Sequence, residues 1–163
     1  MKKFIFVVVV CLCSIIMFSQ ENKNAFDGIR KNGVSFNFLG ITPVIGITYE
    51  RVLSHYMSLE LGVGTNSAGL GVKILPFKIK ESTMMFTTGL STIYADYKDG
   101  WLVNGKRVQL YVPIGLSYYG TKGFNFGIDV GPGSRMYIKE SNNVNEDNGF
   151  LPWAGIKIGQ RFN

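Results

Sequence analysis

The stretch LPWAGIKIGQRFN, residues 151–163, decides the fold of this chain. Ile156, Ile158 and Phe162 would share one face of an extended segment, and small or charged residues dominate the other face. Such alternation with a period of two predicts a strand that has one apolar face. Because an exposed apolar edge strand invites pairing with other chains, we expect this strand to close a barrel in a bilayer.

The N-terminal residues predict export. Two lysines precede an apolar or small stretch over residues 4–18. This stretch is short for a membrane-spanning helix, which needs about 20 apolar residues, but it fits the signal peptide of an exported protein. We therefore expect a cleaved signal peptide over residues 1–19, a polar lead over residues 20–32 and an outer-membrane barrel over residues 33–163.

Composition excludes several classes of protein. Cys11 and Cys13 both lie in the expected signal peptide, so the mature chain would have no disulfide and no thiol site. The chain contains 20 Gly, 8 Tyr and 12 Phe, which favours β-structure with close backbone contacts. The basic residues are scattered and form no run, so nucleic-acid binding is not expected.

Eight segments alternate like the last one and are separated by turn residues. They cover residues 33–41, 44–53, 56–65, 70–77, 83–95, 108–119, 123–138 and 151–163. Large apolar residues fill one face of nearly every segment, whereas Gly, Ser and isolated charges fill the other. A narrow polar interior with lipid outside explains both faces. The sequence thus predicts an all-β fold, an eight-stranded antiparallel up-and-down transmembrane β-barrel. A soluble lipocalin-like binding barrel is the alternative.

The lengths of the connections agree with this topology. Both chain ends of a bacterial outer-membrane barrel lie in the periplasm, so odd-numbered connections face outside and are usually the longer ones. The longest connections here are the fifth and the seventh, residues 96–107 and 139–149. The second and the sixth, residues 54–55 and 120–122, are short. The first and third are short for external loops, which predicts a lopsided outer rim.

Six charged residues fall on the expected inner face: Glu50, Glu60, Lys73, Asp129, Lys157 and Arg161. A charge in a dry interior is costly unless it is paired. We therefore expect the three acids and three bases to form a network of paired charges that fills the barrel. The alternative is a narrow ion or small-solute channel, in which rearranging pairs open an aqueous route.

Enzymatic activity is not expected from these residues. A lipid-modifying enzyme of the outer membrane would need a Ser-His-acid arrangement near the outer leaflet. His55 is the one histidine, and it lies in a turn expected on the periplasmic side. The sequence shows no cluster of ligands with metal spacing, so neither a metal nor another cofactor is expected.

The mature chain resembles the small outer-membrane β-barrel proteins of Gram-negative bacteria, the OmpA/OmpX type of porin-like barrel. The signal peptide, the alternating strands and the ending that contains Gly155, Ile158 and Phe162 carry this resemblance. The ending is similar to the C-terminal signal that the barrel-assembly machinery reads in such proteins. It departs at Gln160, where an aromatic or apolar residue is common, and at Asn163, which follows the usual terminal Phe.

The resemblance implies a location in the outer membrane, contact with its lipid, and the assembly machinery as a partner during insertion. It implies no particular molecular activity. Beside the channel, we therefore expect a structural or surface-interaction role for the two long loops. Asp99, Gly100 and Trp101 would be their contact residues for a surface ligand, because a Trp at a loop tip is a common anchor.

Overall fold

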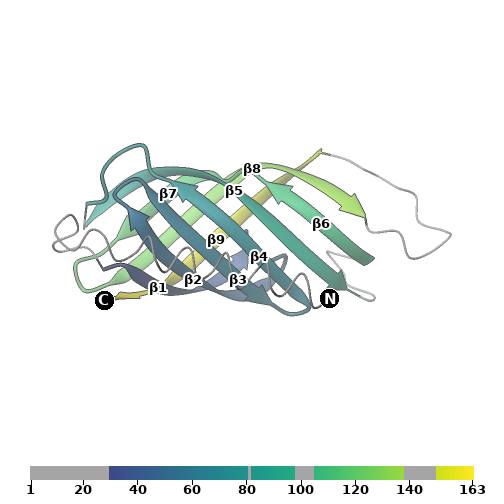
Figure 1. Ribbon diagram of the computed structural model, residues 1–163, viewed down its shortest axis with the longest axis horizontal. Coiled ribbons are helices and arrows are strands. Elements are labelled where there is room, and N and C mark those ends of the chain that lie inside the picture. Colours follow the sequence, from purple (N-terminus) through teal and green to yellow (C-terminus); the bar gives the residue numbers. More distant parts are fainter. Residues whose placement is uncertain (1–29, 81, 98–104, 138–149) are drawn as a thin grey trace.

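A computed structural model describes residues 30–80, 82–97, 105–137 and 150–163, which form one closed antiparallel β-barrel (Figure 1). Its strands are β1 (Asn32–Leu39), β2 (Ile45–Ser54), β3 (Met57–Gly64), β4 (Ser67–Ile74), β5 (Thr83–Tyr97), β6 (Gly105–Tyr111), β7 (Ile114–Tyr119), β8 (Phe124–Tyr137) and β9 (Phe150–Phe162). Within the described part of the chain, no helix is long and apolar enough to cross a membrane.

Strands β6 and β7 form a single strand of the barrel wall. Both pair with β5 on one side and with β8 on the other. The wall therefore has eight strands, which confirms the all-β, eight-stranded antiparallel prediction. The barrel closes where β1 pairs with β9, from Asn32 opposite Phe162 to Leu39 opposite Gly155. The C-terminal stretch is thus the closing strand, as its alternation predicts.

The two ends of the barrel differ in shape, because some strands extend further than others at one end. We call the end with Asn32, Phe162 and the connections 55–56, 75–82 and 120–123 the terminal rim, and the other end the opposite rim. Strands β5, β8 and β9 have 15, 14 and 13 residues, whereas β1, β3 and β4 have 8 each. At the opposite rim, β5, β6, β8 and β9 consequently rise beyond the others as an extended wall (Figure 1).

Most strand boundaries differ from the prediction by one to three residues, and two of the differences have a clear physical cause. The sixth predicted strand is interrupted at Val112 and Pro113, where the Val112 amide donates to the Pro132 carbonyl at 3.1 Å. Pro113 has no amide hydrogen for the ladder, which explains the break. The fourth strand begins at Ser67 rather than at residue 70, because Asn66 takes a left-handed φ of 53° and makes a tight turn.

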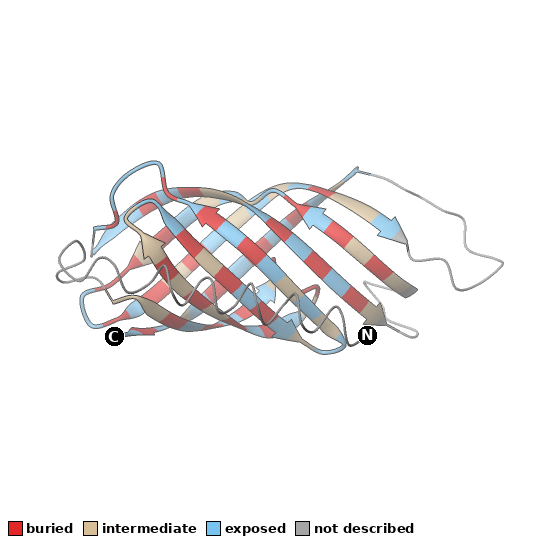
Figure 2. Cartoon of the chain, viewed as in Figure 1, coloured by how far each residue is buried: buried red, intermediate tan, exposed pale blue. Residues whose placement is uncertain are grey.

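Side chains alternate between the two faces of the wall as the pattern predicts, and Figure 2 shows this as bands along each strand. The outer face carries exposed large apolar side chains on every strand, among them Phe36, Ile47, Val63, Leu70, Phe86, Leu110, Leu116, Val130 and Ile158. The inner face carries buried polar and charged side chains together with glycines. Along the described strands, polar side chains therefore lie largely inside the barrel and apolar side chains largely outside.

Candidate functional site

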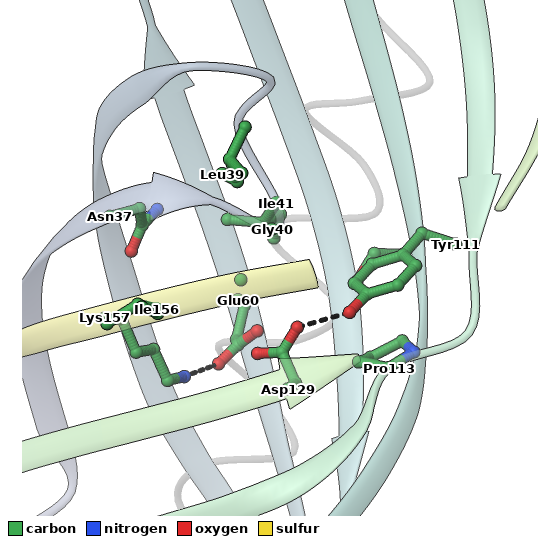
Figure 3. Close-up of a pocket in the computed structure, with 12 residues that line it drawn as sticks. Asn37, Leu39, Gly40, Ile41, Glu60, Tyr111, Pro113, Asp129, Ile156 and Lys157 are labelled. Atoms are coloured by element: carbon green, nitrogen blue, oxygen red, sulfur yellow. Dashed lines mark hydrogen bonds and ion pairs between the residues drawn. The ribbon is translucent and has the colours of Figure 1, made fainter. Parts of the chain in front are cut away.

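Four charged side chains meet inside the barrel and form what we call the ionic cluster: Glu50 of β2, Glu60 of β3, Lys73 of β4 and Lys157 of β9. The Lys73 ammonium lies 2.6 Å from a Glu60 oxygen and 3.7 Å from a Glu50 oxygen. The Lys157 ammonium lies 3.5 Å from Glu50 and also pairs with Glu60 (Figure 3). Each ammonium thus bridges both carboxylates.

The barrel geometry explains why these charges require one another. Glu50 and Glu60 are directly opposite on paired strands, where like charges repel. Only 1% of the surface of Glu50 is exposed, so water does not screen this repulsion. Ser58 at 2.8 Å and Tyr119 at 3.1 Å also donate hydrogen bonds to Glu50. Two lysines and two hydroxyls therefore compensate the buried carboxylates.

The other two predicted interior charges contact aromatic side chains. The guanidinium carbon of Arg161 lies 4.1 Å from the ring centre of Tyr119, a cation–π contact. Asp129 accepts a hydrogen bond of 2.5 Å from the Tyr111 hydroxyl (Figure 3). The structure thus brings four of the six predicted residues into ion pairs and holds the remaining two against tyrosines. Sequence reasoning missed both tyrosines, although each falls on the inner face.

The first connection folds into the barrel, a feature that the sequence analysis missed. Leu39 and Gly40 have left-handed φ values of 60° and 77°, which turn residues 41–43 inward. Thr42 is 0% exposed, and Ile41 and Pro43 are also buried. The Trp153 indole donates to the Gly40 carbonyl at 2.8 Å, and the Gly40 amide donates to Ala154 at 3.0 Å. We call residues 40–43 the lumen plug.

Glycines on the inner faces of β2, β3 and β4 make room for the lumen plug. A Cβ atom on Gly46 would lie 2.6 Å from Thr42, and one on Gly62 would lie 2.9 Å from Ile41. A Cβ atom on Gly69 would collide with the Ile41 carbonyl oxygen. The lumen plug therefore packs against the glycine-rich inner face that the sequence predicts. The available signal was this concentration of glycines in neighbouring strands.

Apolar side chains close the interior at both rims. At the terminal rim, residues 75–80 follow β4, and we call them the terminal cap. Its Leu75 and Ile79 pack on Val52, Met85 and Tyr119 in a buried cluster. Toward the opposite rim, a second cluster lies beside the lumen plug and consists of Ile93, Tyr111 and Trp153, packed against Leu39 and Leu151. The ionic cluster lies between these two apolar layers.

A small cavity lies between the lumen plug and the ionic cluster. Its volume is about 20 Å³, which has room for roughly one water molecule. Asn37, Glu60, Ser91, Tyr111 and Asp129 contribute polar groups to its lining (Figure 3). In the part of the chain that the structure describes, no group of three or more His, Cys, Asp or Glu side chains could hold a metal ion.

The remaining predicted residues divide into two groups. Gly155 faces inward, where a Cβ atom would lie 2.7 Å from the Gly40 Cα, and Ile158 and Phe162 face outward. Their role as an assembly signal stays a prediction. Asp99, Gly100 and Trp101 lie outside the described residues, as do the expected signal peptide and the whole of the seventh connection.

Comparisons of this chain with protein-family models, with curated proteins and with solved structures find no match.

Proposed function

We propose that this chain is an outer-membrane β-barrel protein with a structural or surface-interaction role. The observation that carries the proposal is the inverted distribution of its residues. Every strand exposes large apolar side chains around the wall, whereas Glu, Lys, Arg and Asn side chains are buried inside. Water would make such an exterior costly, and lipid would not. A soluble lipocalin-like barrel would place its apolar residues inside.

The filled interior favours an anchoring role over transport. Two apolar layers, the lumen plug and the ionic cluster follow one another along the barrel axis. An ion crossing this interior would have to displace both layers and separate buried ion pairs. On this proposal, the barrel holds the connections 98–104 and 138–149 at the cell surface. Both connections join strands of the extended wall, and Asp99, Gly100 and Trp101 would contact a surface ligand.

The N- and C-terminal stretches support the same location. The resemblance of residues 1–19 to a signal peptide indicates export, and the ending with Gly155, Ile158 and Phe162 is similar to a signal for barrel assembly. We therefore propose the outer membrane of a Gram-negative bacterium as the site of action. The barrel-assembly machinery would insert the chain.

Gel mobility and cell fractionation test the membrane location. We expect the unboiled protein to migrate faster than the boiled protein, because a folded barrel resists the detergent. We also expect the protein to remain with outer membranes after extraction at high salt. Recovery in the soluble periplasmic fraction, with the same mobility before and after boiling, would refute the proposal and support a soluble barrel.

The narrow channel is the second candidate, because charged and polar side chains line the small cavity. Planar-bilayer recording of the refolded protein separates it from the anchoring role. We expect no discrete conductance steps from the wild-type chain. Reproducible steps that disappear when the protein is heat-denatured would establish the channel instead.

A further inference from the structure

The charges outside the lumen are divided unevenly between the two rims. Among the described residues, the acidic ones are Glu50, Glu60 and Asp129 in the interior and Asp96 near the opposite rim. The terminal rim carries basic residues: Arg30, Lys31, Arg51, Lys78, Lys80 and Lys122. The opposite rim carries Lys106, Arg107 and Arg135 beside Asp96. Outside the lumen, the described residues of the terminal rim thus include six Lys or Arg side chains and no acidic one. The terminal rim is therefore a basic surface.

The packing of the terminal cap turns two of these lysines away from the barrel. Ile79 is buried in the apolar layer, and its amide donates to the His55 carbonyl at 3.3 Å. Lys78 and Lys80, on either side of it, are exposed. Since Ile79 is anchored by packing, its neighbours are held toward the surroundings of the rim.

The neighbouring turn fixes a third lysine in the same way. The Gln160 side chain donates to the Lys122 carbonyl at 2.7 Å, and the Arg30 side chain donates to the Thr121 carbonyl at 2.5 Å. These contacts hold the backbone of the turn and leave the Lys122 side chain exposed. The basic groups thus come from four separate segments that converge on one rim.

Exposed aromatic side chains lie beside these charges. Phe77 directly precedes Lys78 and is 70% exposed, and Tyr56, Phe124 and Phe162 are also exposed at this rim. Aromatic side chains concentrate at the level of the headgroups at both faces of a membrane barrel. The basic side chains beside these aromatic residues would therefore lie at the level of the headgroup phosphates.

We propose that the terminal rim binds anionic phospholipid headgroups in the leaflet that surrounds it. This inference rests on the proposed membrane function. Phosphate oxygens accept charge-assisted hydrogen bonds from Lys and Arg, and a lipid with net negative charge lacks the choline that would repel them. A basic residue near an anionic membrane surface favours binding by about fivefold. The rim therefore selects anionic over zwitterionic lipid.

Native mass spectrometry of the full barrel tests this preference. The protein is released from bilayers that contain equal amounts of phosphatidylglycerol and phosphatidylcholine, and the retained lipids are counted. We expect phosphatidylglycerol to dominate on the wild type. The variant with Lys78→Gln, Lys80→Gln and Lys122→Gln should lower the ratio of the two lipids by at least about fivefold. Lys106→Gln, at the opposite rim, is the matched control and should keep the wild-type ratio.

Salt provides a second measurement. In about 1 M salt the Debye length falls to about 3 Å, so the wild-type preference should approach that of the triple variant. Equal retention of the two lipids by the wild type, or an unchanged ratio in the triple variant, would show that the inference is wrong. The heat-dependent gel shift is measured on the same samples, so insertion is scored separately from lipid choice. A barrel that does not insert overturns both proposals.

An acidic polymer of the cell wall is the competing partner for this surface. Sedimentation with purified peptidoglycan distinguishes it from lipid. We expect the wild type and the triple variant to sediment equally little. Sedimentation of the wild type that the triple variant loses, together with no lipid preference, would assign the rim to the polymer and overturn the lipid proposal.

Discussion

Removing one charged side chain from the ionic cluster should destabilise the barrel strongly. Lys157→Met keeps an unbranched stem of similar length up to Cε and removes the ammonium, which leaves Glu50 and Glu60 to share the ammonium of Lys73. Removing one partner of a buried ion pair costs about 3–5 kcal/mol of folding free energy. Glu60→Gln should cost about the same, because both lysines then face a single carboxylate.

The double variant tests whether these charges act on one another. With Lys157→Met and Glu60→Gln combined, Glu50 and Lys73 remain at a separation of 3.7 Å and their charges balance. Independent losses would add to about 6–10 kcal/mol. Direct coupling should lower the cost of the double variant by about 2–3 kcal/mol below that sum.

Denaturant unfolding in zwitterionic micelles measures these free energies by linear extrapolation. The gel shift provides a second probe of folding. Lys80→Met, on the outside of the terminal cap, is the matched control and should leave the unfolding midpoint unchanged. Costs that add within about 0.5 kcal/mol would refute the reasoning, since they would mean that water screens the charges and the interior is not closed.

Three further variants probe the packing around this cluster. Tyr119→Phe loses the 3.1 Å hydrogen bond to Glu50 but keeps the ring beside Arg161. We therefore expect the free energy of unfolding to fall by about 1–3 kcal/mol in the same denaturant titration. An unchanged free energy would mean that water can replace the hydroxyl as the donor to Glu50. Ile79→Ala should cost about 2–5 kcal/mol and speed hydrogen exchange at the terminal rim, and unchanged exchange would contradict the role of the cap. Gly69→Ala should cost about 1–3 kcal/mol of folding free energy, because the added Cβ atom would collide with the lumen plug. If the same substitution cost as much in a variant that lacks the plug residues, the collision would not be with the plug.

The wall of the barrel was predictable because its signal is local. Alternation with a period of two is visible within each strand, so the outward Phe36 and Ile158 and the inward Glu50 and Lys157 could be placed from the sequence. The break at Pro113 was harder to see, since the apolar residues on either side of it keep the alternation in phase. A proline inside a clean pattern was the sign of an interruption.

The contacts inside the lumen were not predictable in the same way. Lys157 of β9 reaches Glu60 of β3 across two intervening strands, and that meeting depends on the stagger of the whole barrel. The contacts of Asp129 and Arg161 with inward tyrosines also depend on which side chains face each other across the lumen. The lumen plug depends on glycines in three neighbouring strands, and their concentration shows where space is available but not which segment fills it.

Within the described residues, no strand pairs with the β1 side of β9 beyond Gly155, so the extended wall has an edge there. The Ala154 carbonyl faces the β1 side, where it accepts from Gly40. Backbone groups alternate sides along a strand, so the nitrogen of Pro152 points to that same side. A proline nitrogen carries no hydrogen, and a strand from another molecule would find no donor there. The wall can therefore project beyond the barrel while resisting edge-to-edge aggregation.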